Sequence, residues 1–271
     1  NYFLNLLIFS CFSYLVFRPR PYGHRMRLLL VLINEPIPGE VLPKLAADVG
    51  EAKASDYYKA LIEVMLRQLQ GLEKCRIRFC YSPDDASDAT KFWLLPKMDA
   101  HSSKTEGLYV APGRVSADQL PQEVDFRAQG HGDLGQIIQR AFSDAFSEGY
   151  QEVALVDPTC IDCGARWINA TFARFHTKTS RDTVIGPTDK GRYYILALKS
   201  EAPELFEDIQ WHSEALLSST EAKAKRAGRN VELLPQLAET TTLEDWQRLL
   251  TSPLGAALKK ALGEPLEDIS L

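Results

Sequence analysis

Hydrophobic runs alternate along the chain with segments whose apolar positions recur at helical spacing. Residues 27–33 form an apolar run typical of a strand buried on both faces, and residues 51–69 carry apolar side chains every three or four positions, which predicts a helix. The same pattern predicts further strands at 76–81, 152–156, 183–185 and 193–198 and helices at 134–146, 165–175 and 213–226. Such alternation implies crossover connections, so we expect a single-domain α/β fold with a mostly parallel central sheet and helices on both faces.

The segments between these elements also carry information. Residues 34–43 contain prolines and a glycine, which predict a loop. Residues 94–123 are polar with scattered Pro and Gly, as in an insertion or a lid. Two short amphipathic segments follow residue 242, and we expect them to pack on the sheet or on a partner. The expected division is a domain over residues 26–250 and a helical tail over 251–271.

The first 25 residues differ in character from the rest. Residues 2–17 carry no charged side chain and precede Arg18, Arg20 and Arg25. A membrane span needs about 20 apolar residues, and a signal peptide has its positive charges before the apolar core. We therefore expect translation to begin at Met26, with the preceding stretch an extension of the reading frame. The alternative is a signal-type core or a tilted anchor. Under the first interpretation we expect a cytoplasmic protein, with a membrane as partner only if the N-terminal segment is real.

Composition and charge narrow the class of function. Hydrophobic residues make up 45% and charged residues 25% of the 271 positions, which argues against a disordered, collagenous or coiled-coil chain. The formal net charge of −5 argues against a nucleic-acid partner, because such partners are held by clustered cations. Five cysteines are too few for a secreted disulfide framework, and Cys160 and Cys163 supply at most two of four zinc ligands. We predict ordinary thiols there and small molecules or proteins as partners.

Four separated stretches carry recognisable motifs. They are LLLVLINEPIPGEVLPKL at 28–45, QGHGDLG at 129–135, VIGPTDKGRYYILALK at 184–199, and ELFEDIQWHSEALLSST at 204–220, which continues into VELLPQLAETTTLEDW at 231–246. In this order they resemble a bacterial family of the nucleotide-diphospho-sugar transferase (GT-A) fold, identified with arsenosugar-biosynthesis glycosyltransferases that accompany radical-SAM proteins. The stretches span nearly all of residues 26–250.

The resemblance implies a nucleotide-sugar site at the carboxyl ends of the parallel strands, where doubly wound sheets hold ligands. It also implies a divalent cation, Mg or Mn, that neutralises the departing nucleotide while a glycosyl or nucleotidyl group passes to an acceptor. The positions it assigns to nucleotide binding are Pro38, Gly39, Lys44, Gly132, Asp133, Lys190, Gly191 and Arg192. Those it assigns to the acceptor side are Tyr194, Trp211 and His212.

Several positions depart from the family pattern, and the departures concern charge. The cations of the first loop are reduced to Lys44, and the expected metal-binding aspartate falls on Thr159. A neutral hydroxyl is a poor ligand for a hard divalent ion. An aspartate and a glycine of the third motif stand here as Lys190 and Arg192. We therefore infer a cleft whose charged lining has been rewritten.

Two hypotheses of function follow. In the first, the protein is an active transferase in which Asp157, Asp189 and Glu239 supply the base or the metal ligands. Asp157 is the first candidate for a metal, and Lys190 and Arg192 meet the phosphates. In the second, it is a catalytically inactive GT-A-fold protein that binds or regulates. A nucleotide sugar or nucleotide is the expected ligand of both. A third alternative is a structural partner in a homo-oligomer, held through the insertion at 94–123 or through the C-terminal helices.

Structural roles compete with functional ones at single residues. Asp133 is expected to be an N-cap rather than part of an anion site, and Trp211 is expected to pack rather than to stack on a base. Tyr193 and Tyr194 alternate along one strand, so one is expected in the core and the other in the cleft. His131 and His212 could exchange protons near neutral pH, but a solvated or hydrogen-bonded loop histidine is the expected state.

Overall fold

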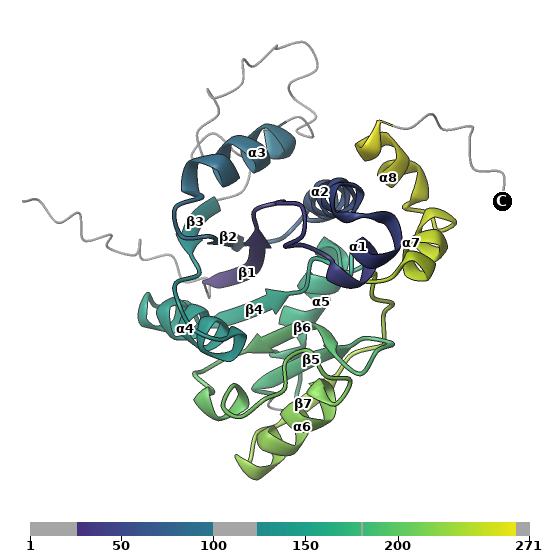
Figure 1. The fold of residues 1–271 in the computed structure, drawn as a ribbon. Helices are drawn as coiled ribbons and strands as arrows, with labels where there is room; N and C mark the ends of the chain where they lie inside the picture. Colours follow the sequence, from purple (N-terminus) through teal and green to yellow (C-terminus); the bar gives the residue numbers. More distant parts are fainter. Residues whose placement is uncertain (1–25, 100–123, 180, 264–271) are drawn as a thin grey trace, which may run out of the picture.

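The computed structural model describes residues 26–99, 124–179 and 181–263, which form one α/β unit (Figure 1). Its strands are β1 (Arg27–Asn34), β2 (Cys75–Ser82), β3 (Val124–Ala128), β4 (Glu152–Val156), β5 (Thr183–Pro187), β6 (Tyr193–Leu198) and β7 (Val231–Leu233). Its helices are α1 (Pro43–Val49), α2 (Glu51–Gln68), α3 (Ser87–Asp99), α4 (Leu134–Ser147), α5 (Ala165–Arg174), the 3-10 turn η2 (Pro203–Leu205), α6 (Leu216–Arg226), α7 (Leu243–Leu250) and α8 (Gly255–Leu262).

The strands form one sheet in the order β3-β2-β1-β4-β6-β5-β7. β1 pairs in parallel with β2 and β4, β2 pairs in parallel with β3, and β5 pairs in parallel with β7. β6 is antiparallel to both of its neighbours, β4 and β5. The predicted mostly parallel sheet is therefore confirmed, with β6 as the reversed strand.

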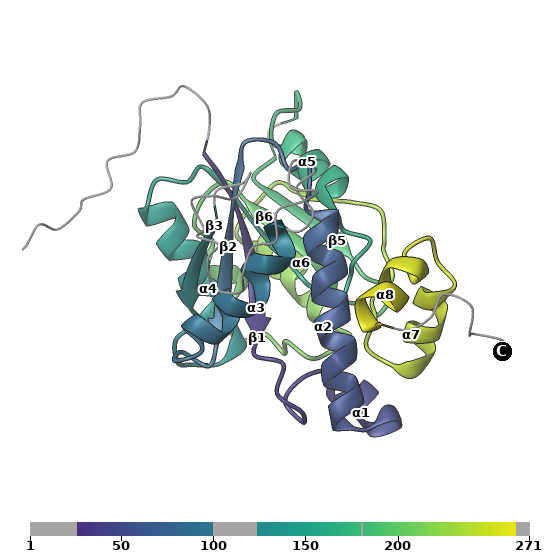
Figure 2. The ribbon, with the colours of Figure 1, turned by 90° about the horizontal axis from the view of Figure 1, so that it is seen from above.

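Alternate residues of β1 point into two separate hydrophobic clusters. Leu29, Val31 and Ile33 lie in the cluster covered by α2, α5, α7 and α8, whereas Leu28 and Leu30 lie in the cluster covered by α4 and α6. Helices therefore cover both faces of the sheet, as Figures 1 and 2 show. Burial on both faces explains why this strand reads as an uninterrupted apolar run.

The strands that the sequence did not predict, β3 and β7, lie at the two sides of the sheet. β3 and β7 are the two edge strands of the sheet, and edge strands are often short with a weak hydrophobic pattern. The expectation that regular structure dissolves from residue 94 is wrong for residues 94–99. There α3 continues to Asp99, because Leu94 and Leu95 are buried against the neighbouring elements. The predicted helix at 213–226 begins later, at Leu216.

Expectations for residues 1–25, for most of the predicted insertion and for the end of the tail lie outside the described residues. Within the described ranges, none of the helices has the combination of length and apolar character that crossing a membrane demands. The C-terminal pair α7 and α8 packs beside α2, where the Trp246 and Tyr57 rings stack with centroids 4.1 Å apart.

Candidate functional site

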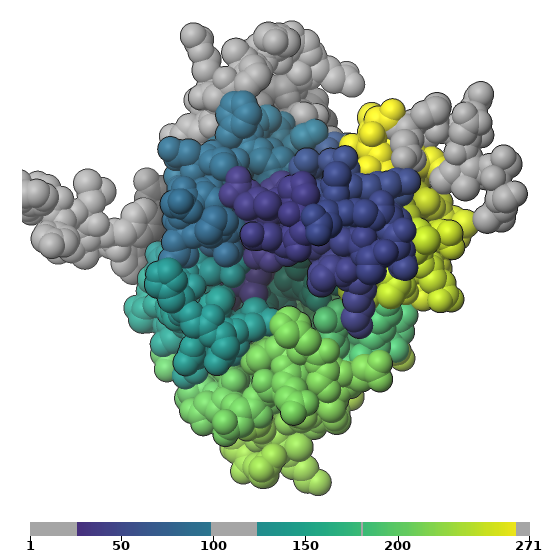
Figure 3. All heavy atoms as spheres, viewed as in Figure 1, coloured from purple at the N-terminus to yellow at the C-terminus, as the bar shows by residue number. Residues whose placement is uncertain are grey.

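The loops that carry most of the predicted site residues leave the sheet at one edge, whereas Trp211 and His212 follow β6, the reversed strand, whose carboxyl end lies at the opposite edge. β1, β2, β3, β4, β5 and β7 run in the same direction, so their carboxyl ends lie together. Figure 3 shows a hollow on this face, bounded by the β1–α1 segment in purple and blue, by α4 in teal, and by the green segment between β6 and α6. The arrangement agrees with the general location of ligands in doubly wound sheets.

The β1–α1 segment forms one wall of this hollow. Gly39 has a φ of +89°, which favours glycine, and a Cβ there would lie 3.3 Å from the carboxyl group of Glu51. The Ser55 hydroxyl donates to the carbonyl of Pro36 and holds the loop against α2. Lys44 is exposed in the first turn of α1 and forms no ion pair with any described residue, so its ammonium group is available to a ligand.

The β3–α4 loop ends in a capped helix. The Gln136 N–H donates to Asp133 Oδ1 at 2.9 Å, and the Asp133 N–H donates to Gln136 Oε1 at 3.1 Å. This reciprocal pair is a capping box, so the expected N-cap role of Asp133 is confirmed. Gly132, with a φ of +129°, sets the loop before the cap. An anion at this helix start would have to share N–H groups with the Asp133 carboxylate.

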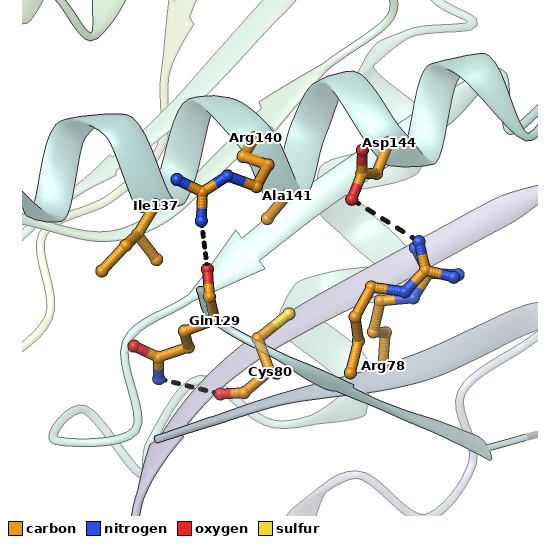
Figure 4. Close-up of a pocket in the computed structure, with 9 residues that line it drawn as sticks. Arg78, Cys80, Gln129, Ile137, Arg140, Ala141 and Asp144 are labelled. Atoms are coloured by element: carbon orange, nitrogen blue, oxygen red, sulfur yellow. Dashed lines mark hydrogen bonds and ion pairs between the residues drawn. The ribbon is translucent and has the colours of Figure 1, made fainter. Parts of the chain in front are cut away.

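Enclosed space near these loops is small. A cavity of about 10 Å³ lies between β2, β3 and α4, where Arg140 donates to the Gln129 carbonyl and the Gln129 amide donates to the Cys80 carbonyl (Figure 4). A second cavity of about 30 Å³ lies between α4 and the segment around Pro203. Neither has room for a nucleotide, so the open hollow is the candidate site.

Asp157 follows β4 directly and is half-buried at the carboxyl edge. Its N–H donates to the Tyr194 carbonyl at 2.8 Å, which fixes the backbone to β6. Its Oδ1 accepts from both the N–H and the hydroxyl of Thr159, each at 2.8 Å. No hydrogen bond to Oδ2 comes from a described residue. Thr159, at the position where the resemblance expects a metal ligand, therefore orients the Asp157 carboxylate instead.

The turn between β5 and β6 carries Lys190 and Arg192, the two cations that depart from the family pattern. The Thr188 hydroxyl accepts from the N–H groups of Lys190 and Arg192, and Gly191 adopts a φ of +69° at the bend. Asp189 Oδ1 accepts from the Glu239 N–H at 3.0 Å, which joins this turn to the loop that follows β7.

Each charged side chain of this turn pairs with a partner from the C-terminal part of the chain. Arg192 holds both carboxylate oxygens of Glu239, with Nε 2.9 Å from Oε2. The Lys190 ammonium donates to Asp245 and, at 2.8 Å, to the Thr241 hydroxyl.

Arg248, on α7, completes the cluster. Its guanidinium lies 3.4 Å from Asp189 Oδ2 and 3.2 Å from Asp245 Oδ1, and it donates to the Glu239 carbonyl at 3.2 Å. The pattern of the α7 sequence alone did not single out Arg248, because its contact with Asp189 joins segments distant in sequence. We call Lys190, Arg192 and Arg248, with Asp189, Glu239 and Asp245, the ion-pair cluster.

Burial differs strongly among these groups. Glu239 is 0% exposed, whereas 24% of the Arg192 side chain and 49% of the Arg248 side chain remain exposed. Burial acts to raise the pKa of Asp245, but the hydrogen bonds from Lys190 and from the Thr241 and Thr242 segment outweigh it and lower that pKa to about 2. Asp245 is therefore ionised near neutral pH, and each carboxylate of the cluster is paired with a protein cation.

The residues predicted on the acceptor side differ in accessibility. Tyr194 is fully buried, and its hydroxyl donates to the Pro235 carbonyl at 3.0 Å. Tyr193 is buried as well, so both tyrosines belong to the core. Trp211 stacks on Phe206 with centroids 6.2 Å apart and is 9% exposed, in agreement with the expected packing role. His212 is exposed, as is His131.

Gly191, which was predicted at the nucleotide, and Gly135, in the first turn of α4, allow close packing. A Cβ on Gly191 would lie 2.0 Å from the Glu214 carbonyl oxygen, and the Gly191 carbonyl accepts from the Leu217 N–H at 2.9 Å. At Gly135 a Cβ would lie 2.7 Å from the Trp211 indole nitrogen. These contacts seat the segment before α6 against the β5–β6 turn and the start of α4.

The residues at this edge fit a divalent cation poorly. Mg²⁺ and Mn²⁺ need several free oxygen ligands, at about 2.0–2.2 Å for Mg²⁺. Here Asp189 accepts from the Glu239 N–H and forms an ion pair with Arg248, and Glu239 accepts from Arg192. No group of three or more His, Cys, Asp or Glu side chains suited to a metal occurs among the described residues. Cys160 and Cys163 offer no substitute, because both are buried and burial raises the pKa of each thiol.

Comparison with known proteins now identifies the family. The family described as "Uncharacterized protein conserved in bacteria (DUF2064)" matches residues 65–213, more than half of the chain. The chain belongs to this family. No curated protein matches it.

The fold of this family member has relatives among solved structures. A protein provisionally named a nucleotide-diphospho-sugar transferase, from Desulfovibrio desulfuricans G20, is 26% identical with a TM-score of 0.69 over 87% of this chain and 96% of that one. A cytidylyltransferase from Leptospira borgpetersenii is 10% identical, with a TM-score of 0.47 over 83% and 85% of the two chains. The first likeness confirms the predicted nucleotide-diphospho-sugar transferase type of α/β fold.

Proposed function

We propose that this protein binds a nucleoside diphosphate sugar in the hollow at the carboxyl edge and transfers its glycosyl or nucleotidyl group to an acceptor. The observation that carries the proposal is the convergence of the loops bearing Gly39, Lys44, Gly132 and Asp157 on one hollowed face. The fold shared with the Desulfovibrio protein supports it. The proposed catalytic unit is residues 26–250.

Within this proposal, the Asp157 carboxylate acts either as the general base or as the negative charge that stabilises the sugar as it is transferred. Two hydrogen bonds from Thr159 fix its Oδ1, which orients Oδ2 for a proton from an acceptor hydroxyl. Lys44 and the positive-φ loop at Gly39 are the proposed contacts of the phosphates, with Pro38 shaping the same loop. Asp189 and Glu239 remain at this edge, where they hold Arg248 and Arg192.

The binding step is tested by calorimetry with UDP, GDP, CTP and their sugars. Binding of one nucleotide class is the expected result, and no heat with any of them would contradict the proposal.

The transfer step is tested with Asp157→Asn, which keeps the hydrogen-bond geometry but removes the charge. General acid–base groups contribute about 10²–10⁴-fold to rate, so we expect a loss in this range, with the affinity for the nucleotide little changed. The measurement is nucleotide release from the sugar nucleotide. Asp56→Asn is the matched control, because Asp56 is exposed on α2 and pairs only with Lys59 among the described residues. Equal rates for the two variants would remove Asp157 from the reaction.

A second candidate is a binding or regulatory protein without turnover. It is favoured by the ion pairs that occupy Asp189 and Glu239, two of the three carboxylates predicted for catalysis. Nucleotide binding without release of product, even with candidate acceptors present, would support it. The resemblance to arsenosugar-biosynthesis enzymes makes sugar-type acceptors of that class the first to try.

A further inference from the structure

We infer that a diphosphate ligand binds at the ion-pair cluster without a divalent cation, because the carboxylates of the cluster already pair with protein cations and the exposed part of Arg248 can donate to the phosphates. This inference rests on the proposed nucleotide-binding function and concerns how the same edge treats the phosphates. It also assigns Arg248 as a ligand-binding residue.

Most carboxylate oxygens of the cluster already accept hydrogen bonds or pair with a cation. Both oxygens of Glu239 accept from Arg192, and Asp189 accepts from the Glu239 N–H and faces Arg248. Asp245 Oδ2 accepts from Lys190 and from the N–H groups of Thr241 and Thr242. A metal could reach these oxygens only by displacing charge-assisted hydrogen bonds, which are the strongest that proteins make.

The charges of the cluster balance. Three carboxylates, Asp189, Glu239 and Asp245, face three cations, Lys190, Arg192 and Arg248, so the cluster is neutral. A divalent cation would therefore find no excess of negative charge to hold it, unlike at a site built from unpaired carboxylates.

The cations of the cluster differ in their access to solvent. Glu239 is fully buried, and Arg192 donates to both of its carboxylate oxygens. This pair therefore holds the β5–β6 turn to the loop that follows β7. Arg248 touches the turn after β5 and the loop after β7, and about half of its side chain, 49%, stays exposed. A planar guanidinium offers paired donors that match phosphate oxygens. Arg248 is therefore the member of the cluster that can meet a phosphate while its protein contacts persist.

The test measures the affinity of the full chain for UDP, GDP and CDP by calorimetry, in EDTA and in MgCl₂ or MnCl₂ at equal ionic strength. The expected affinities in the two media agree within about threefold. In EDTA, Arg248→Met is expected to weaken binding by about tenfold or more, the equivalent of about 1.4 kcal/mol. Arg226→Met is the control, because Arg226 is exposed near the end of α6 and bonds within its own helix.

A second measurement keeps the test independent of folding defects and of the nucleotide. Mn²⁺ alone is titrated into the ligand-free chain, and no saturable binding is expected, while thermal melting checks that the Arg248→Met chain is folded. Nucleotide binding that needs Mg²⁺ or Mn²⁺, or saturable Mn²⁺ binding by the chain alone, would overturn the inference and leave the proposed function standing. No nucleotide binding in either medium would overturn both. Metal-independent binding that Arg248→Met leaves unchanged would overturn the role of Arg248.

Discussion

At the scale of single residues, the decisive feature is the asymmetry of the pair between Arg192 and Glu239. The carboxylate is fully buried, whereas the guanidinium keeps contact with solvent. Removing Arg192 therefore leaves the buried Glu239 carboxylate without a partner, whereas removing Glu239 leaves a guanidinium that water can still solvate. Pairs of this kind are weak evidence of net stability, yet breaking them from one side is costly.

We expect Arg192→Met to lower the free energy of unfolding by about 3 kcal/mol or more, because the buried carboxylate loses its partner. The double variant Arg192→Met with Glu239→Leu is expected to recover most of that loss, since no charge then stays buried. Urea unfolding followed by circular dichroism measures both. A double variant that is no more stable than Arg192→Met would contradict the argument.

Single residues also show the limits of sequence reasoning. The capping role of Asp133 was predictable, because its partner Gln136 stands three residues away. The partners of Arg192 and Lys190 lie 47 and 55 residues away in the sequence, and no local pattern marks them. Lys190 and Arg192 were accordingly predicted to meet phosphates, and the structure instead places carboxylates of the protein beside them.

At the scale of elements, the β5–β6 turn is held by close approach as well as by charge. The segment before α6 presses the Glu214 carbonyl against Gly191, where a Cβ would have no room. Gly228, which ends α6, has a similar φ of +70° but no neighbour within 4 Å of its Cβ position. The two glycines therefore share the backbone requirement and differ in packing.

We expect Gly228→Ala to cost about 1 kcal/mol of stability, from the positive φ alone. Gly191→Ala should cost at least about 2 kcal/mol more, because the added methyl group overlaps a backbone atom. Chemical unfolding of the two variants side by side measures the difference in their free energies of unfolding. Equal losses would mean that the segment before α6 moves away from the added methyl group at little cost. Gly191→Ala should also weaken nucleotide binding, since this turn borders the proposed site.

At the scale of the whole molecule, the C-terminal helices pack on α2, and α7 also joins the candidate site. Trp246 of α7 stacks on Tyr57 of α2, while Asp245 of the same helix binds Lys190 of the β5–β6 turn. The β5–β6 turn is thus connected to α2 through the single helix α7. Acid should weaken the ion pair between Asp245 and Lys190.

The pKa of Asp245 is lowered to about 2 in the folded protein, below the ordinary value of 3.8. Its ionised form therefore stabilises the fold fully above about pH 4, and that contribution is lost as the pH falls towards 2. We expect the urea midpoint, followed by tryptophan fluorescence, to fall over this range. Asp245→Asn should be less stable near neutral pH and should show a flatter acid dependence, while Asp56→Asn should follow the wild-type curve. Parallel curves for the wild type and Asp245→Asn would contradict the assignment.

The sequence by itself determined the framework of this protein. Continuous apolar runs separated by amphipathic helices specify a parallel sheet covered on both faces, because that is where such segments bury their apolar surface. The direction of the strands then placed Gly39, Gly132, Asp157 and Lys190 at one edge. Only the tertiary structure decided what the charges do there. The partners of Lys190 and Arg192, and the contact of Arg248 with Asp189, are brought together by the packing of segments far apart in the chain, and electrostatic energy depends on distance in space and on burial rather than on local pattern.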